Sequence, residues 1–491
     1  MSESDTKRLA ALSSRSELAE KISWLRELGP RETGNSDHQR FVTWIAEQLS
    51  SLGLTVRRDT FNFDRWSSAG SECSLTVRGT DAGDLTVPVA SAYPYSGSTG
   101  PTGIAAPLHF VGYPYWWFGC RGKIAVIEVP HPAVPVNLLL DRAGQLPTDA
   151  TGFPDHYRHP VLSAYAFGPK FGLARLAGAL GVVAIWKGLT RAQAADQYVR
   201  FDLPYQHVPA VWVADEDRQH LVDHARRGAE ATLVLNAPLQ RAGTDTVWTV
   251  VEGEITSESV LVISHTDGVN AVEETGAIGI LELARVFARG PRPERTIVFI
   301  FVTGHLRIPA VTDQSHAQAT TAWLAAHPEW WSGKDGAPRA VAGLVIEHLG
   351  ALANARGASE AVEPASELVY ATNAMMQKIL KESWPGRQRG KALIAEPNGL
   401  FQIGEGEPLY KVGIPAIALV SVPEYLLAVT KTDVVDVDLM QEQIATFARA
   451  LCVIERTPAP LLGRAKRAGL LKRLGTLIQI AWTVARVRLL L

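Results

Sequence analysis

The chain has 491 residues, 46% hydrophobic and 20% charged, with a formal net charge of −2, which is the composition of a globular protein of about two or three domains. The near-neutral balance gives no overall electrostatic case for a nucleic-acid partner, and no apolar run reaches the roughly 20 residues of a membrane-spanning helix. The three cysteines are widely spaced and the first residues lack an apolar signal core, which predicts a reducing, cytoplasmic setting without a disulfide framework.

The first part of the chain, residues 15–61, predicts a helix, a turn, a second helix and a strand. Leu18, Ile22 and Leu25 recur at helical spacing, and residues 54–61 alternate between apolar and polar as a half-buried strand does. These periods place two amphipathic helices and one strand ahead of the long middle region.

Residues 85–240 differ in composition from the rest of the chain, with many Pro, Gly, Tyr and Trp residues. This change of composition predicts an inserted domain. Within it we expect buried strands at 122–128 and 208–213, and a helix within 173–185 that ends in glycine and leads into a further strand.

From residue 258 onward, apolar strand patterns alternate with helical patterns. The expected strands are 260–264, 296–302 and 340–346, and the expected helices are 276–288 and 317–327. Crossovers of helix length between strands are typical of a parallel arrangement. The sequence therefore predicts an α/β fold with a doubly wound, mainly parallel sheet.

The tail from about residue 462 is basic and contains no acidic residue. Leucine, isoleucine and tryptophan residues are interleaved with the arginines and lysines. One interpretation is a basic amphipathic helix at a membrane surface or in a groove of a protein partner. The other is a terminal helix that packs on the domain and exposes its basic face.

A His-x-Asp pair, His265 and Asp267, directly follows the apolar run 260–264. In an open α/β sheet this position is a carboxyl strand end, where such folds bind ligands. An imidazole beside a carboxylate that orients its neighbours is a recurrent zinc-binding arrangement. This segment therefore predicts a metal-binding position.

The order of several motifs resembles the zinc aminopeptidases of the aminopeptidase Y and bacterial leucyl aminopeptidase type, whose fold glutaminyl cyclases share. Residues 28–34 are similar to an early Gly-Pro-Arg turn of that family, and residues 413–419 to a late Gly-Ile-Pro-Ala strand. Residues 85–240 resemble a protease-associated (PA) domain. That second resemblance rests on motifs at 122–124, 177–183 and 208–210.

The resemblance implies a zinc-peptidase fold that carries a β-rich PA-like insert. It divides the chain into an N-terminal part of the peptidase-like domain (15–84), the insert (85–240), the remaining peptidase-like domain with the active cleft (241–458) and a basic C-terminal helix (459–491).

The family binds two metal ions, and the resemblance assigns residues of this chain to one of them. His265 stands at the histidine ligand, Asp267 at the carboxylate that supports it, and Glu347 at a further carboxylate ligand. The family's bridging aspartate is replaced by Val272, so we expect a neighbouring glutamate to supply the third ligand. Glu273 is assigned as that ligand, with Glu274 as its alternative and as a catalytic carboxylate.

The other metal position has lost its ligands in this chain. Leu306 and Val429 stand where the family has ligands of the second metal, and neither side chain can bind a cation. His305 takes the position of the family's general-base glutamate, and an unperturbed imidazole titrates near 6.5. We therefore expect at most one zinc ion, with His305 as the base.

Three nearby residues received a different interpretation. His348 follows Glu347 directly, so strand alternation predicts that its side chain points to the opposite face. Glu405 is expected to be a solvated loop acid, and Tyr425 to pack in the core or at the cleft rim.

Together these residues favour a divergent metal-dependent hydrolase acting on an amide or peptide-like small substrate. Two alternatives stay open. One is an inactive pseudo-peptidase that binds or scaffolds, and the other is a cyclase or transferase on the same fold.

Overall fold

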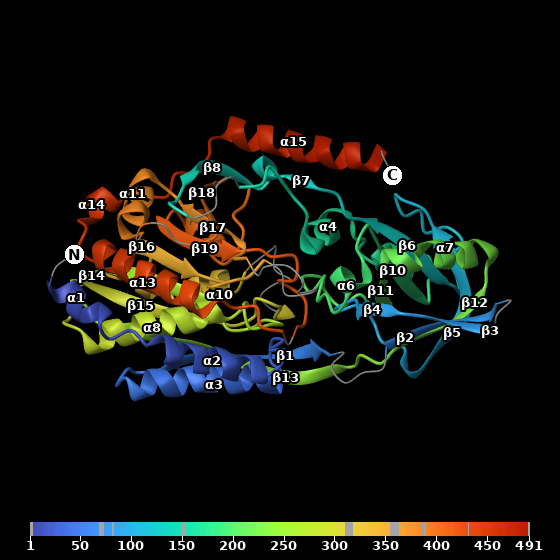
Figure 1. Cartoon of the computed structure of the whole chain (residues 1–491), viewed down its shortest axis with the longest axis horizontal. Coiled ribbons are helices and arrows are strands. Elements are labelled where there is room, and N and C mark those ends of the chain that lie inside the picture. The colour runs from blue at the N-terminus through green and yellow to red at the C-terminus, as the bar shows by residue number, and fades with distance from the viewer. Residues whose placement is uncertain are drawn as a thin grey trace.

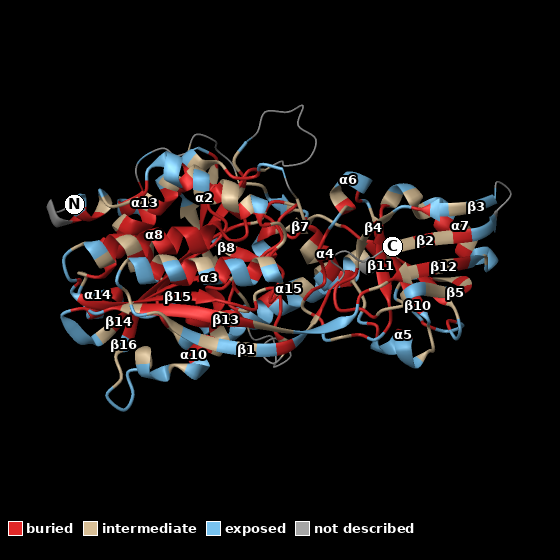
Figure 2. Ribbon diagram, turned by 90° about the horizontal axis from the view of Figure 1, so that it is seen from below, coloured by how far each residue is buried: buried red, intermediate tan, exposed pale blue. Residues whose placement is uncertain are grey.

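The computed structural model describes residues 3–67, 73–80, 83–148, 153–309, 318–353, 363–384, 386, 389–430 and 432–489. Two large sheets lie toward opposite ends of an elongated molecule (Figure 1). Figure 2 shows that buried residues concentrate in these sheets and in the helices that cover them.

The larger sheet has nine strands. In spatial order they are β1 (Arg57–Trp66), β13 (Leu239–Val251), β15 (Arg295–Val302), β14 (Ile255–His265), β16 (Arg339–Ile346), β19 (Ala416–Ser421), β17 (Ser366–Ala371), β18 (Lys391–Pro397) and β8 (Leu140–Gln145). The central strands β15, β14, β16 and β19 are parallel. The α/β prediction is confirmed, but the outer pairings include antiparallel ones, so the sheet is mixed.

Helices cover this sheet on two faces, because its central strands are apolar on both. Val260 and Val262 of β14 pack in one core and Leu261 and Ile263 in another. The first face is covered by α2 (Arg15–Glu27), α3 (Ser36–Ser51), α8 (Thr275–Arg289), α11 (Ala374–Ser383) and α13 (Val437–Ile454). The second is covered by α10 (Ala319–Ala326) and α12 (Glu407–Val412).

The start of α8 lies directly against the strand ends. A Cβ atom at Gly276 would lie 2.0 Å from the Ile346 carbonyl oxygen and 2.6 Å from Ser264 Oγ. Only glycine permits this approach, because any side chain would overlap the backbone of β16. The close contact brings the residues just before α8 to the carboxyl ends of β14 and β16.

The second sheet has eight strands. In spatial order they are β3 (Gly83–Val87), β2 (Cys73–Thr80), β12 (Glu230–Leu235), β5 (Gly100–Val111), β6 (Ile124–Pro130), β10 (Gly181–Lys187), β11 (Ala210–Val213) and β4 (Val89–Ala92). It starts before residue 85, the expected boundary of the insert, and β8 leaves the insert to pair with β18. The helix expected within 173–185 is short, since α5 spans only Gly172–Leu176. The likeness of residues 85–240 to a PA domain stays a prediction.

The remaining elements are short, apart from the last helix, α15 (Leu470–Leu489), and α7 (Arg218–Arg227), which contacts β5. The others are α1 (Glu3–Leu9), α4 (Pro160–Phe167), α6 (Arg191–Ala194), α14 (Ala459–Leu462), the pair β7 (Val134–Pro135) and β9 (His156–Tyr157), and 3-10 turns at 136–138, 215–217 and 328–330. Among the described residues, none of the helices combines the length and apolarity that crossing a membrane requires.

Candidate functional site

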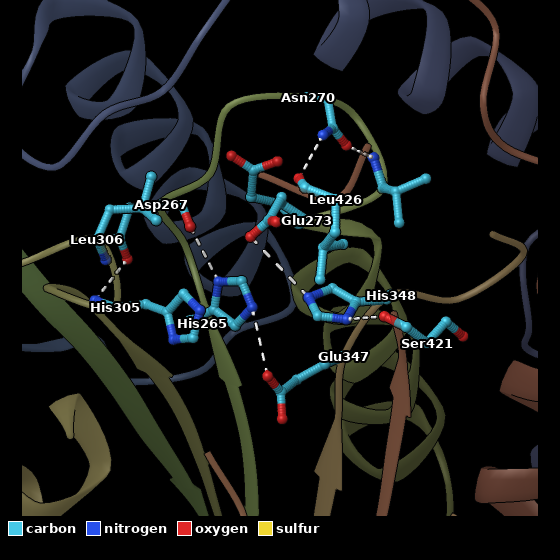
Figure 3. A network of polar contacts seen from close by, with 12 residues as sticks. His265, Asp267, Asn270, Glu273, His305, Leu306, Glu347, His348, Ser421 and Leu426 are labelled. Atoms are coloured by element: carbon cyan, nitrogen blue, oxygen red, sulfur yellow. Dashed lines mark hydrogen bonds and ion pairs between the residues drawn. The ribbon is translucent and has the colours of Figure 1, made fainter. Parts of the chain in front are cut away.

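Histidines and carboxylates from several elements meet at the carboxyl ends of the central strands (Figure 3). His265 is the last residue of β14, and Glu347 follows the last residue of β16. His305 comes shortly after β15, and Glu273 lies just before α8. His265 Nε2 lies 3.6 Å from Glu347 Oε2. The structure therefore brings together residues that are up to 82 positions apart in sequence because parallel strands share one edge.

His265 is oriented through its own loop. Its Nδ1 lies 3.0 Å from the Asp267 carbonyl oxygen, which can only accept a hydrogen bond. Nδ1 therefore carries the proton, and Nε2 presents a lone pair to the cluster. Burial, together with the nearby rings of His305 and His348, lowers the pKa of His265 well below its ordinary value, so the ring is neutral.

His348 belongs to this cluster, and the prediction that it points to the opposite face is wrong. β16 ends at Ile346, and His348 has a left-handed φ of 53°, so strand alternation no longer applies. Its Nδ1 donates to the Ser421 carbonyl oxygen at 2.8 Å, and its Nε2 lies 3.9 Å from Glu273 Oε2. Burial lowers the pKa of His348 to about 3, which leaves a second neutral imidazole.

Glu273 and Glu347 are wholly buried carboxylates. Glu347 accepts the backbone N–H of Glu405 through Oε1 at 2.9 Å. A left-handed turn at Gly404 (φ +86°) allows this contact, since a Cβ there would lie 2.4 Å from Glu347 Oε1. Burial raises the pKa of Glu347 to about 8 and that of Glu273 well above its ordinary value.

Buried polar atoms without hydrogen bonds gather in this cluster. The atoms of the cluster that have no hydrogen-bond partner among the described residues are His265 Nε2, both carboxylate oxygens of Glu273, Glu347 Oε2 and His348 Nε2. Burying such atoms without a partner is unfavourable. Two ligands of a tetrahedral zinc, each about 2.0–2.2 Å from the ion, lie about 3.4 Å apart, which is close to the 3.6 Å and 3.9 Å contacts above. The donor set and its spacing fit one metal ion.

Asp267 holds the loop after β15 rather than facing the cluster. Its carboxylate accepts the backbone N–H groups of Gly304 and His305, each at 3.2 Å, and of Leu306 at 2.7 Å. The Thr33 hydroxyl also donates to it. These bonds place the His305 ring over His265, with ring centroids 4.1 Å apart and planes 16° from parallel.

His305 is paired with Glu405, so the interpretation of Glu405 as a solvated acid is wrong. Glu405 is 1% exposed, and its carboxylate contacts His305 Nδ1 at 2.9 Å and the Thr320 N–H at 3.0 Å. Burial alone would lower the pKa of His305. The hydrogen bond to Glu405 and the charges of Glu405, Glu273 and Glu347 outweigh it and raise that pKa to about 10, so it does not titrate near 6.5.

Glu274 lies beside Glu273 in sequence but in a different environment. Arg31 Nε and Nη2 donate to its two oxygens at 2.7 Å and 2.8 Å, and both side chains are buried. Arg31 offsets only part of the burial, which raises the pKa of Glu274 to about 7. The structure therefore places Glu273 in the cluster and Glu274 in a separate ion pair.

The fold is matched by solved structures, although no protein-family model and no curated protein matches the sequence. An aminopeptidase from Aneurinibacillus sp. strain AM-1 is 16% identical with a TM-score of 0.59, over 95% of this chain and 97% of that one. A zinc aminopeptidase from Bacillus subtilis is 17% identical with a TM-score of 0.59, over 89% and 94%. A peptidase M28 precursor from Shewanella amazonensis SB2B is 16% identical with a TM-score of 0.62, over 93% and 96%. The chain has the zinc aminopeptidase fold.

On this zinc aminopeptidase fold, apolar side chains fill the positions that the sequence assigned to lost ligands. Leu306 is 1% exposed and packs in the core of the second sheet, against which Val429 also packs. Val272 is buried in the core below α8. Tyr425 is also buried, and its hydroxyl donates to the Leu352 carbonyl oxygen at 2.6 Å.

The cluster is almost wholly buried. The side chains of His265, Glu273 and Glu347 are 0% exposed and that of His348 is 3% exposed, whereas His305 is 20% exposed. The His305 ring also lies 6.3 Å from that of Phe201, between ring centroids. Among these residues His305 is the most exposed.

The contact between Glu405 and His305 leads to a testable prediction. We expect Glu405→Gln to lower the pKa of His305 in the metal-free protein, because the largest raising influence is removed while burial remains. Because the folded pKa of His305 lies above its unfolded value of about 6.5, the contact stabilises the fold below pH 6.5 and loses this effect as the pH rises to about 10. Histidine NMR titration measures the shift, with exposed His220 as the internal control, and an unchanged titration of His305 would contradict it.

Proposed function

We propose that the protein is a metal-dependent hydrolase that acts on amide or peptide-like small substrates with a single zinc ion. The observation that supports this most is the set of unpaired, buried donor atoms beside a partly exposed His305. Solved aminopeptidases with the same fold support the reaction class. The apolar residues Leu306 and Val429 support one metal rather than two.

His265, Glu347 and His348 would hold the ion, because ligand atoms of these three residues lie within 4.8 Å of one another. Glu273 forms a second such group with His265 and His305. When bound, zinc polarises a carbonyl group and lowers the pKa of water. The protein residues supply orientation: Asp267 fixes the His265 tautomer through its carbonyl and fixes the loop that carries His305 through its carboxylate. His348 is a ligand of this proposed site that the sequence analysis did not predict.

His305 is proposed to move the proton. Its Nδ1 is engaged by Glu405, which leaves Nε2 for exchange with substrate, in the general arrangement of an acid–base residue oriented by a third group. The pKa of His305 falls once the charges of Glu273 and Glu347 are neutralised, since both raise it. Glu405 is then a positioning residue, and its removal should misalign the imidazole as well as shift its pKa.

A second candidate function is a pseudo-peptidase that binds metal without hydrolysis. One observation favours it: the proposed ligands are 0–3% exposed, whereas a catalytic zinc keeps an open position for water or substrate. In this alternative the ion would take part only in stabilising the fold. Metal content alone does not separate the two candidates, but turnover does.

The test measures metal content and hydrolysis of amino-acid p-nitroanilides and dipeptides together. We expect about one zinc per chain and turnover that His305→Gln reduces by about 100-fold or more with the zinc retained, since a general acid–base residue contributes about 10²–10⁴-fold. His220→Gln, in the exposed face of α7, is the matched control and should change neither. Bound zinc without turnover in the wild type would support the pseudo-peptidase, and loss of zinc in His305→Gln would make His305 a ligand.

A further inference from the structure

The last helix, α15, lies along the outside of the molecule and reaches from the larger sheet toward the second one (Figure 1). One side of the helix holds it there. The Thr476 hydroxyl donates to the Asn398 carbonyl oxygen at 3.3 Å, and Lys472 pairs with Asp141. Val484 and Val487 pack against the core of the second sheet. The helix is therefore fixed to the body of the protein at several points along its length.

The opposite side of α15 is apolar and faces solvent. Thr476, Ile480, Thr483, Val484 and Val487 are buried or partly buried, which defines the inward side. The exposed large residues recur at helical spacing on the other side: Leu470 (80%), Leu471 (86%), Leu474 (52%), Leu477 (52%), Ile478 (61%) and Trp482 (68%). Ala481 and Ala485 are also exposed and continue this surface. We call these residues the outer apolar face.

Helix α15 and the segment that leads into it carry only basic charged residues. Residues 456–491 contain eight arginines and lysines and no aspartate or glutamate. Arg473 and Arg486 are exposed on α15, and Arg464, Lys466 and Arg467 are exposed in the segment that leads into it. The helix therefore packs on the domain and exposes basic residues, as one of the two interpretations expected, and it exposes an apolar face as well.

We propose that the outer apolar face of α15 docks on an anionic lipid surface. A 20-residue helix is about 30 Å long, and such a helix can lie in the plane of a membrane interface with its apolar side among the acyl chains. Basic residues then meet lipid phosphates, and tryptophan residues such as Trp482 favour the headgroup level.

Charge favours lipid over a second copy of this chain. Two α15 helices packed face to face would bring arginines and lysines together without any acidic residue on either helix to pair with them. An anionic surface would complement the exposed Arg473 and Arg486. The inference is independent of the proposed hydrolysis, because none of its residues belongs to the metal cluster.

The experiment is flotation of the full-length protein with phosphatidylcholine vesicles that contain or lack about 30% phosphatidylglycerol. We expect binding to the anionic vesicles only, and weaker binding at high salt. Arg473→Gln with Arg486→Gln should weaken partition by about 25-fold, because each basic residue near such a surface contributes about fivefold. Leu474→Ser, Ile478→Ser and Trp482→Ser combined should abolish it.

The matched control replaces two leucines of α5, Leu173→Ser and Leu176→Ser, which are exposed to a similar degree (65% and 79%) in the second sheet's domain. These changes should leave flotation intact. Absence of wild-type binding to anionic vesicles would overturn the proposal. The proposal would also be overturned if the wild type is a dimer in solution, the triple variant is a monomer and neither protein floats with vesicles. The outer apolar face would then bind a second copy of the chain. Circular dichroism and thermal unfolding confirm that each variant is folded.

Discussion

Replacing His265 by alanine should remove zinc from the purified protein, from about one ion per chain to less than about a tenth. His265 contributes the lone pair nearest to Glu347, and its tautomer is fixed by the Asp267 carbonyl oxygen, so no other side chain replaces this donor. The affinity of a zinc site follows the number and geometry of its ligands. Elemental analysis after dialysis against zinc measures the change.

Two further measurements make this result specific. His131→Gln changes a buried histidine that lies outside the cluster, hydrogen-bonded to Ser163, and should leave the zinc content unchanged. Glu347→Gln should lower it as His265→Ala does, because it removes the neighbouring carboxylate. Two ions bound in the wild type would contradict the single-metal site, and full zinc retention in His265→Ala would place the metal elsewhere.

The second large effect is expected at Glu274. Glu274→Ala should reduce the free energy of unfolding by about 3–5 kcal/mol, because it leaves the buried guanidinium of Arg31 without its carboxylate partner. Because the pKa of Glu274 is raised to about 7 in the folded protein, above its unfolded value of about 4.3, the contribution of this carboxyl group to stability falls as the pH rises from about 4 to 7 and is constant above that range. Denaturant unfolding at pH 8 measures it.

The control for this prediction is Asp64→Ala, which breaks an ion pair with Arg241 that is about two-thirds exposed on both sides. Its effect should stay within about 1 kcal/mol, as is usual for exposed pairs. If Glu274→Ala keeps its stability but loses zinc or turnover, Glu274 has the site role that its sequence position suggested.

The strands that carry the site could be predicted because their signal is local. The apolar runs around residues 260–264, 296–302 and 340–346 are long and rich in β-branched and aromatic residues, and they end directly before polar residues. A parallel sheet then places those ends side by side. The pattern places His265 and the end of the 340–346 run at the same edge of the sheet, the resemblance singled out Glu347 there, and the structure brings the two side chains to 3.6 Å.

The residues that were misjudged depend on contacts that are distant in sequence. Glu405 is buried by His305 and Thr320, which are 100 and 85 residues away, and no local pattern separates it from a solvated acid. Strand alternation does not apply to His348, because β16 ends two residues earlier at Ile346. The useful signal was the glycine at 350 and the end of the apolar run, which together indicate that the strand had already stopped.

Strand β8 has a consequence for how the protein can be divided. Its residues, Leu140–Gln145, come from the middle of the region that forms the second sheet, yet they complete the edge of the nine-stranded sheet beside β18. Cutting out residues 85–240 as a cassette would therefore expose the backbone of β18, which invites aggregation through an open edge. The region of the second sheet therefore contributes a strand to the nine-stranded sheet. Transferring that region to another protein would require residues 140–145 to stay with the nine-stranded sheet.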